Sequence, residues 1–528
     1  MSRDFQLPGR SPVIARDGMA ATSHPLASLA AIDTLRAGGN AADAAVAAVA
    51  TLCVVEPHMT GIGGDCFWLV SKPGQPLSGY NGSGRAGAGA GASYEALRAQ
   101  GLTEIGNSIH CVTVPGAIDA WQAILNAHGR FGLDRALAPA IKYAEGGFPV
   151  APRVAWDWRR YVDKLAADPG AAKHYLFNGV APREGDVIRF PALAATLKTI
   201  AAKGARAFYE GEIAADIAAT VATRGSFLRE EDFARHHGDA ATPISTNYRG
   251  LDIAELPPNG QGLTALVMLN ILENFDLKSL DPTGAERFHL VLEAARLAFA
   301  VRDTHIADAA HMRVAVADLI DKGFAKTLAA KIDLKKRTRL PAAPSPGSNT
   351  VYFTVVDRDR MAVSFINTLY SYFGSRICTE KTGILLTDRG ACFTMAEGHP
   401  NVFGPDKRPL HTIIPALAMK NGRCDMSFGV MGADYQPMGH AQIVTSMLDY
   451  GMDVQQAIDG PRFFFDGEQT VVETGTSAAT VEGLKTRCHD VVFAATPWGG
   501  AQTIKIDWDR GVLIAGSDPR KDGCALGY

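Results

Sequence analysis

The segment PGSNTVYFTVVDRDR, residues 346–360, changes from a loop-like to a strand-like composition at Asn349 and Thr350. The preceding KKRTRLPAAPSPGSN (335–349) has the charge, proline and serine content of an exposed linker. The following runs VYFTVV and AVSFI are β-rich and are joined by DRDR, which predicts a hairpin. The fold must therefore accommodate a helix-rich part before residue 350 and a β-rich part after it.

The part before residue 350 is predicted to be mainly helical and to cover a sheet. HPLASLAAIDTLRAGGNAADAAVAAVATLCVVEP (24–57) predicts two Ala-rich helices, separated at GGN and packed as a hairpin. Two strands are expected around TGIGGDCFWLV and before SGYNGSGRAG, which leaves Arg85 on a glycine-rich turn where binding residues are often found. From about residue 114 to 334 the pattern is mainly helical, with the turn LPPNGQG in between.

Composition and charge exclude several classes of function. The 52 Lys and Arg residues against 55 Asp and Glu give a net charge of -3, which offers no basic footprint for nucleic acid or a membrane surface. The eight cysteines are scattered without a CxxC pair, and the N-terminus has no apolar signal-like stretch. The longest early apolar run, Ala44 to Val55, is too short to cross a bilayer and predicts a buried helix. We therefore expect a cytoplasmic protein whose partners are small molecules.

Several common catalytic motifs are missing from the sequence. No GxGxxG follows a predicted strand, and GxxxxGK[ST], HExxH and GxSxG do not occur. The usual sequence support for dinucleotide, nucleotide, zinc-protease and α/β-hydrolase sites is therefore lacking. We expect no cofactor and no metal.

Several long segments together resemble the γ-glutamyltranspeptidase family in order and spacing. They are GMAATSHPLASLAAIDTLRAGGNAADAAVAAVATLCVVEPHMTGIGGD, VPGAIDAW, YRGLDIAELPPNGQG, TGILLTD, GPDKRPLHTIIPA and GSDPRKDGCALGY, and they span nearly the whole chain. The resemblance implies an α/β (α+β) fold, the αββα four-layer sandwich of the N-terminal-nucleophile hydrolases. It also implies an inactive precursor that cuts itself before a threonine.

By this resemblance, the self-cleavage site is the bond between Asn349 and Thr350. Cleavage would give a helix-rich large subunit (1–349), ending in the exposed linker 335–349, and a β-rich small subunit (350–528). A threonine hydroxyl is a weak nucleophile and needs a base beside it. The α-amine freed on Thr350, with an ordinary pKa of about 7.7–8.0, would supply that base on the nucleophile's own residue.

The resemblance also implies residues that assist the nucleophile. Thr368, 18 residues after Thr350, matches the position whose hydroxyl bonds to the nucleophile, although a cross-strand β-branched residue is the alternative interpretation. GVMGADYQ matches the family's oxyanion-hole segment, in which two successive backbone N–H groups meet the developing oxyanion. Here these N–H groups belong to Gly432 and Ala433, which we call the oxyanion turn. Main-chain donors carry the effect, so alanine in the second place is compatible with it.

The residues expected to bind substrate depart from the family pattern. Arg85 matches the arginine that binds the α-carboxylate of a γ-glutamyl group, but the family's serine pair is replaced by His411 and Thr412. At three further positions, an expected acidic residue, glutamine and asparagine are replaced by Cys392, Arg389 and Tyr370. An arginine where an ammonium group should bind repels it by several kcal/mol when water is excluded. A γ-glutamyl substrate should therefore be rejected.

The remaining pocket suits a short anionic amide without an amino group. It resembles the transpeptidase-like branch of the family that includes oxamate amidohydrolases of purine-ring catabolism, which implies hydrolysis of oxamate to oxalate and ammonia. A cephalosporin or glutaryl acylase and a γ-glutamyl hydrolase or transferase are the enzyme alternatives. An uncleaved, inactive homologue that acts as a binding protein is the alternative from a different class.

Overall fold

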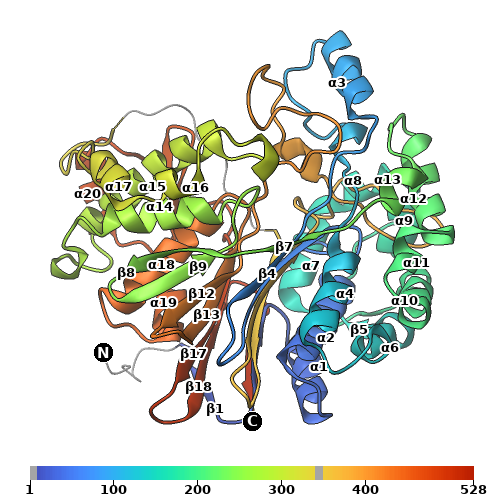
Figure 1. The fold of residues 1–528 in the computed structure, drawn as a ribbon, viewed down its shortest axis with the longest axis horizontal. Coiled ribbons are helices and arrows are strands. Elements are labelled where there is room, and N and C mark those ends of the chain that lie inside the picture. The colour runs from blue at the N-terminus through green and yellow to red at the C-terminus, as the bar shows by residue number, and fades with distance from the viewer. Residues whose placement is uncertain (1–8, 339–348) are drawn as a thin grey trace.

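The computed structural model describes residues 9–338 and 349–528. Most of the predicted linker, 339–348, therefore lies outside the described residues. Two large β-sheets stand side by side in the middle of the molecule, with helices on both outer faces (Figure 1). This is the expected αββα four-layer sandwich.

The described residues form two antiparallel sheets of seven strands each. In spatial order, the first contains β1 (Val13–Ala15), β18 (Val512–Ser517), β17 (Gly500–Asp507), β13 (Arg423–Met431), β12 (Ala416–Lys420), β9 (Leu251–Glu255) and β8 (Ile244–Tyr248). The second contains β19 (Cys524–Gly527), β2 (Met19–Thr22), β10 (Val351–Val356), β11 (Ala362–Thr368), β3 (Asp65–Ser71), β4 (Ser78–Gly82) and β7 (Asp239–Ala241). Strands from before and after residue 350 thus share both sheets.

The two sheets pack closely face to face. Thr354 on β10 donates a hydrogen bond to Ser427 on β13, with 2.6 Å between the hydroxyl oxygens. A Cβ placed on Gly429 of β13 would lie 2.4 Å from the ring of Tyr352 on β10. Glycine is therefore required there, because any side chain would push the sheets apart.

One helical layer covers the second sheet. Its inner helices are α1 (Pro25–Arg36), α2 (Ala41–Val55) and α4 (Ala117–His128). The surrounding elements are α3 (Ala90–Ala99), α5 (Leu133–Ala136), α6 (Ala138–Gly146), α7 (Pro152–Trp158), α8 (Val162–Ala166), α9 (Pro169–Tyr175), α10 (Pro191–Lys203), α11 (Arg206–Tyr209), α12 (Glu212–Ala222), α13 (Glu230–Ala234) and the strand pair β5 (Phe148–Pro149) and β6 (Val187–Ile188).

The other helical layer covers the first sheet. Its inner helices are α14 (Gly262–Leu272), α18 (Gln436–Leu448) and α19 (Val454–Asp459). The outer elements are α15 (Ala285–His305), α16 (Val316–Leu319), α17 (Lys322–Ala329), α20 (Ala478–Thr486) and a small sheet of β14 (Phe463–Asp466), β15 (Gln469–Val472) and β16 (Asp490–Phe493).

The local predictions for the first helices and for the hairpin are confirmed. The break between α1 and α2 ends at Asn40, which caps the N-terminus of α2. Its side chain accepts hydrogen bonds from the backbone N–H groups of Ala42 and Asp43. Every residue of α2 is buried, as its sequence, apolar except for Asp43 and Thr51, requires. No helix in the described ranges is long and apolar enough to cross a membrane.

The helical prediction for residues 114–334 is incomplete. It overlooks β7, β8 and β9, of which β9 pairs with β12 in the first sheet. These strands are short, five residues or fewer, and a short run shows too few periods to separate a strand from a helix.

Candidate active site

The predicted nucleophile lies at the open end of the hairpin formed by β10 and β11, opposite the connecting turn. Thr350 directly precedes β10 and is fully buried, and Thr368 is the last residue of β11. The antiparallel register pairs Val351 with Asn367, so the two threonines meet at the end of the hairpin. Their hydroxyl oxygens are 2.9 Å apart, a hydrogen-bond distance.

The backbone at Thr350 has an unfavourable conformation. Its φ of 94° is positive, which is a genuine outlier for a β-branched residue and costs about 1–3 kcal/mol. The preceding Asn349 is also buried, and its side-chain oxygen has no hydrogen-bond partner among the described residues. The strain therefore falls at the peptide bond that the resemblance marks for cleavage.

The Thr368 hydroxyl is fixed by the backbone that follows it. Its oxygen accepts a hydrogen bond of 2.8 Å from the N–H of Tyr370, whose φ of 80° is again positive. One lone pair and the hydroxyl proton of Thr368 remain for Thr350. The nucleophile thus has a neighbour that can either donate a hydrogen bond to it or accept one from it.

The predicted oxyanion turn lies between β13 and α18. Gly432 and Ala433 both have positive φ, 130° and 50°. Within residues 9–338 and 349–528, neither residue's N–H donates a hydrogen bond to another protein group. The two N–H groups are therefore available for an oxyanion, as this role requires.

Arg389 brings a buried positive charge to the same region. It begins the short 3₁₀ turn Arg389–Cys392, and its side chain is fully buried. Its Nη1 donates to the Thr412 hydroxyl at 2.9 Å, and its guanidinium carbon lies 4.2 Å from the centre of the Tyr370 ring. Its Nε and Nη2 have no partner among the described residues. A buried charge without a full set of partners is costly, which favours an anion at this position.

His411 is held by an internal acid partner. Its Nε2 lies 3.0 Å from a carboxylate oxygen of Asp65, and its Nδ1 accepts the N–H of Ile413 at 3.3 Å. Burial, with the charge of Arg389 adding to it, lowers the pKa of His411 to about 4, so the ring is neutral near neutral pH. Both ring nitrogens are thus occupied within the protein, and direct contact between His411 and a substrate stays a prediction.

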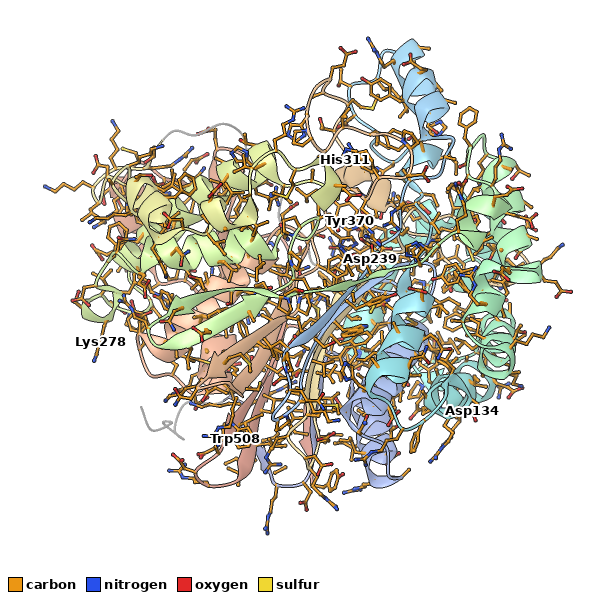
Figure 2. The ribbon with its side chains drawn as sticks, in the orientation of Figure 1. Asp134, Asp239, Lys278, His311, Tyr370 and Trp508 are labelled. Carbon is orange, nitrogen blue, oxygen red and sulfur yellow. The ribbon has the colours of Figure 1, made fainter. Side chains whose placement is uncertain are left out.

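Arg85 is already paired in this structure. Its Nη2 lies 3.1 Å from a carboxylate oxygen of Asp239, and its Nη1 donates to the carbonyl of His237 at 3.2 Å. Arg408 forms a second ion pair with the same carboxylate. The side chain of Arg85 is 28% exposed, in contrast to Arg389. Figure 2 shows Asp239 and Tyr370 at the upper end of the strands. The carboxylate-binding role of Arg85 stays a prediction.

Comparison with known proteins establishes the family. The model described as Gamma-glutamyltranspeptidase matches residues 27–528. The chain belongs to the gamma-glutamyltranspeptidase family. It is accordingly an amidohydrolase, in a family whose members include proenzymes. The family and the fold type predicted from the sequence are confirmed.

Relatives with different named activities cover nearly the whole chain. It is 40% identical to the Glutathione hydrolase-like YwrD proenzyme of Bacillus subtilis (98% of this chain, 99% of the relative). It is 35% identical to the Oxamate amidohydrolase proenzyme of Klebsiella pneumoniae (98% and 99%). The crystal structure of cephalosporin acylase from Bacillus halodurans superposes with a TM-score of 0.93 at 37% identity (100% and 99%). Because these relatives have different named activities, similarity to them does not specify the substrate of this chain.

Two supporting side chains of the site were not predicted. Asp65, the partner of His411, follows the glycines of TGIGGD at the start of a strand that the sequence predicts, but the strand prediction assigns no role to its side chain. Gln261 lies in LPPNGQG, which was interpreted only as a turn. An acidic residue at the start of a buried strand was a usable signal for Asp65, whereas nothing local to Gln261 indicated its partners.

One buried cluster in the described residues has the composition of a metal site. Ligand atoms of His289, Glu293 and His489 all lie within 4.8 Å of one another. However, the two imidazoles already share a hydrogen bond of 2.8 Å, and the Nε of Arg296 is 3.9 Å from Glu293. Burial, together with His289 and nearby arginines including Arg296 and Arg337, lowers the pKa of His489 to about 3. Since these arginines also oppose a bound cation, we assign no metal to this cluster.

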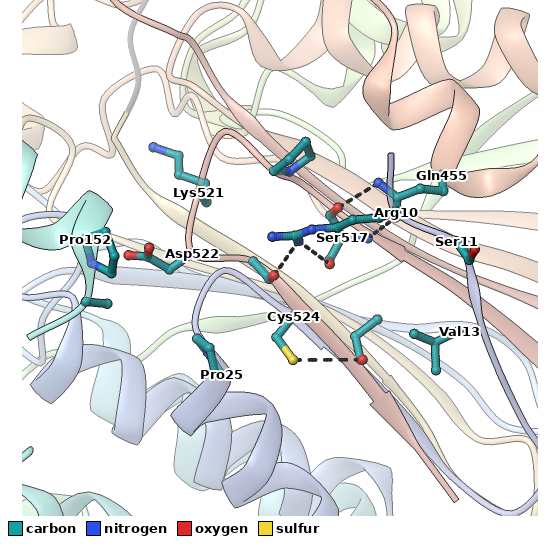
Figure 3. Close-up of a pocket in the computed structure, with 14 residues that line it drawn as sticks. Arg10, Ser11, Val13, Pro25, Pro152, Gln455, Ser517, Lys521, Asp522 and Cys524 are labelled. Atoms are coloured by element: carbon teal, nitrogen blue, oxygen red, sulfur yellow. Dashed lines mark hydrogen bonds between the residues drawn. The ribbon is translucent and has the colours of Figure 1, made fainter. Parts of the chain in front are cut away.

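A separate cavity of about 720 Å³ lies beside the C-terminal strands (Figure 3). Its wall includes Arg10, whose guanidinium donates to the carbonyl of Gly523 at 2.6 Å. It also includes Lys521, and burial lowers the pKa of this lysine to about 7. None of the predicted site residues lines it. This cavity is therefore distinct from the candidate active site.

Proposed function

We propose that the protein is a self-processing amidohydrolase that hydrolyses a short anionic amide, with oxamate as the best candidate, through an acyl-enzyme on Thr350. The observation that carries the substrate proposal is the buried guanidinium of Arg389, which is packed on Tyr370 and whose Nε and Nη2 have no hydrogen-bond partner within residues 9–338 and 349–528. A guanidinium binds a carboxylate with two parallel hydrogen bonds.

Self-processing would begin with the Thr350 hydroxyl oxygen attacking the carbonyl carbon of Asn349. The C–N bond breaks, the acyl group moves to the hydroxyl oxygen as an ester, and water then hydrolyses the ester. This leaves a carboxylate on Asn349 and a free amine on Thr350. The positive φ of Thr350 supports this step, because cleavage removes the constraint that imposes the strained conformation.

In the mature enzyme, the freed amine of Thr350 would accept the hydroxyl proton as the oxygen attacks the substrate amide. The N–H groups of the oxyanion turn would stabilise the tetrahedral oxyanion, and Thr368 would orient the nucleophile. Protonated by the amine, the leaving group departs as ammonia. Water then attacks the acyl-enzyme, so that oxamate and one water give oxalate and ammonia.

The positions that depart from the family pattern support an anion without an amino group. Cys392 stands where the resemblance calls for an acidic residue, and its sulfur is 3.5 Å from Nη1 of Arg389. A substrate ammonium would meet this guanidinium instead of a carboxylate, and close like charges are strongly disfavoured away from water. We further propose that the protein acts in the cytoplasm, in purine-ring catabolism.

A substrate panel tests the proposal. Purified protein is given oxamate, a glutaryl amide, γ-glutamyl-p-nitroanilide, and the anilide with glycylglycine as acceptor. We expect ammonia release from oxamate to be fastest, with no stimulation by the acceptor. Faster turnover of the anilide, with stimulation by glycylglycine, would make the protein a transpeptidase, and preference for the glutaryl amide would make it an acylase.

A further inference from the structure

We infer that Gln261 is a positioning residue that holds the oxyanion turn in its active shape and ties it to the substrate pocket. This inference rests on the proposed role of the oxyanion turn in acyl transfer. Gln261 comes from LPPNGQG, which links β9 to α14, and its side chain is fully buried.

The side-chain amide of Gln261 bridges two segments that are distant in the sequence. Its Nε2 donates to the carbonyl of Thr412 at 2.8 Å and to the carbonyl of Ala433 at 2.9 Å. Its backbone N–H also donates to the carbonyl of His411 at 2.9 Å. Gln261 thus bonds both to the pocket residues His411–Thr412 and to the oxyanion turn, beside a second link in which the side chain of Gln436 accepts the N–H of Ile414 at 3.1 Å.

Arg302 on α15 fixes the orientation of this amide. Its Nη1 donates to Oε1 of Gln261 at 2.8 Å and also pairs with the carboxylate of Asp434. Because an arginine can only donate, Oε1 of Gln261 must face it, and the NH₂ group must face the two carbonyls. Arg302 and Asp434 are both largely buried, so their ion pair is only weakly screened by solvent.

The bridge acts on a residue whose conformation needs support. Ala433 has a φ of 50°, in the left-handed region that a side chain makes unfavourable. Holding the Ala433 carbonyl fixes the peptide on its C-terminal side, and the N–H of the same residue is the second predicted oxyanion donor. Without the bridge, Ala433 can relax and turn this N–H away from the oxyanion.

A misplaced oxyanion donor weakens the transition state more than substrate binding. Loss of one such donor lowers kcat by roughly 10²–10³-fold in well-studied cases. Since removing Gln261 misaligns the donor and does not delete it, we expect a smaller loss in kcat, about 10–100-fold, with KM changed by less than about threefold.

The test compares Gln261→Glu and Gln261→Ala with a matched control. Glutamate keeps the shape and the partner Arg302 but cannot donate to the two carbonyls. Gln455→Glu is the control, because Gln455 is equally buried and its Nε2 donates to the carbonyl of Ser517, yet it lies on α19 and lines the other cavity. All three variants are compared by thermal unfolding, and kcat and KM are measured for those that fold. Both Gln261 variants should lose kcat, whereas Gln455→Glu should change only stability.

A rescue variant separates positioning from general destabilisation. Glycine adopts positive φ without the side-chain clash, so Ala433→Gly in the Gln261→Ala background should recover kcat by roughly 3–10-fold. Kinetics use whichever substrate of the panel wild type hydrolyses, so failure of oxamate refutes the proposed substrate but leaves this test intact. A kcat within about twofold of wild type in folded Gln261→Glu, or a loss without rescue by glycine, would overturn the inference.

Discussion

The nucleophile side and the pocket side of the active site are built in different ways. Thr350 and Thr368 are placed by two adjacent strands, whose register brings their hydroxyls to 2.9 Å. The oxyanion turn, Arg389 and His411 lie instead on irregular segments, joined by buried side chains such as Gln261 and Asp65. A strand pair places its end residues through a repeating backbone pattern, whereas an irregular segment depends on individual side-chain bonds. A single substitution on the pocket side can therefore remove a positioning contact, whereas the backbone itself holds the nucleophile side.

The largest expected effect is loss of the nucleophile. Thr350→Ala should leave one uncut chain of 528 residues and reduce amide hydrolysis by at least roughly 10⁴-fold, because a methyl group cannot attack either carbonyl. A denaturing gel and an ammonia assay measure both effects. Thr350→Ser keeps the hydroxyl and should still be cut into residues 1–349 and 350–528, more slowly. Normal fragments from the alanine variant would show that another residue or a protease makes the cut.

On the pocket side, Arg389 should matter more than Arg85. Arg389→Gln should lower kcat/KM for oxamate by about 2–3 kcal/mol, roughly 30–150-fold, since it removes a charge-assisted pair in a dry site. Arg85→Gln should cost less than about tenfold, because Arg85 is partly exposed and already paired with Asp239. Arg389→Lys is the control, because it keeps the positive charge but cannot form the bidentate pair of hydrogen bonds with a carboxylate. An Arg389→Gln enzyme with unchanged oxamate kinetics would remove the basis for the anionic substrate.

On the nucleophile side, removing the supporting hydroxyl should have an intermediate effect. Thr368→Val keeps the shape but leaves the N–H of Tyr370 and the hydroxyl of Thr350 without this partner, which costs about 1–3 kcal/mol. Self-cleavage and substrate hydrolysis should both slow by roughly 10–100-fold. Thr368→Ser should stay near wild type in both assays. If valine slows neither reaction, Thr368 is only a cross-strand packing residue.

The smallest expected effect is a pH dependence of stability from His411. Its pKa is about 4 in the folded protein against an ordinary value of 6.5, so the unfolded chain takes up a proton first as the pH falls. The contribution of neutral His411 to the free energy of unfolding is therefore present above about pH 6.5 and is lost as the pH falls towards 4. Between about pH 7 and pH 5 the free energy of unfolding should fall by about 1–2 kcal/mol from this group. Because other buried histidines act with the same sign, the comparison is with His411→Gln, in the uncut Thr350→Ala background. Chemical denaturation should show a shallower pH dependence for the glutamine variant, and equal slopes would contradict the assignment.

On the nucleophile side, local patterns predicted the hairpin, whereas the candidate roles of Thr350 and Thr368 came from the resemblance to the family. The β-rich runs after the linker predicted the hairpin, and the spacing of 18 residues placed Thr368 on the strand beside Thr350. They were insufficient for β8 and β9, whose short runs lie between helical patterns. They also failed for Asp65, because its partner His411 is 346 residues away.

The sequence by itself determined the family through its ordered motifs, and the resemblance to that family implied the αββα fold and the candidate nucleophile. Hydrophobic periodicity, which is a local signal, was enough for the first helices. Only the tertiary structure decided that Arg389 is buried with two nitrogens unpartnered in the described part of the chain, while Arg85 is paired with Asp239. It alone also placed Gln261 between Thr412 and Ala433. The physical reason is that burial and hydrogen-bond partners depend on which distant segments the two sheets bring together, and no spacing along the chain encodes that.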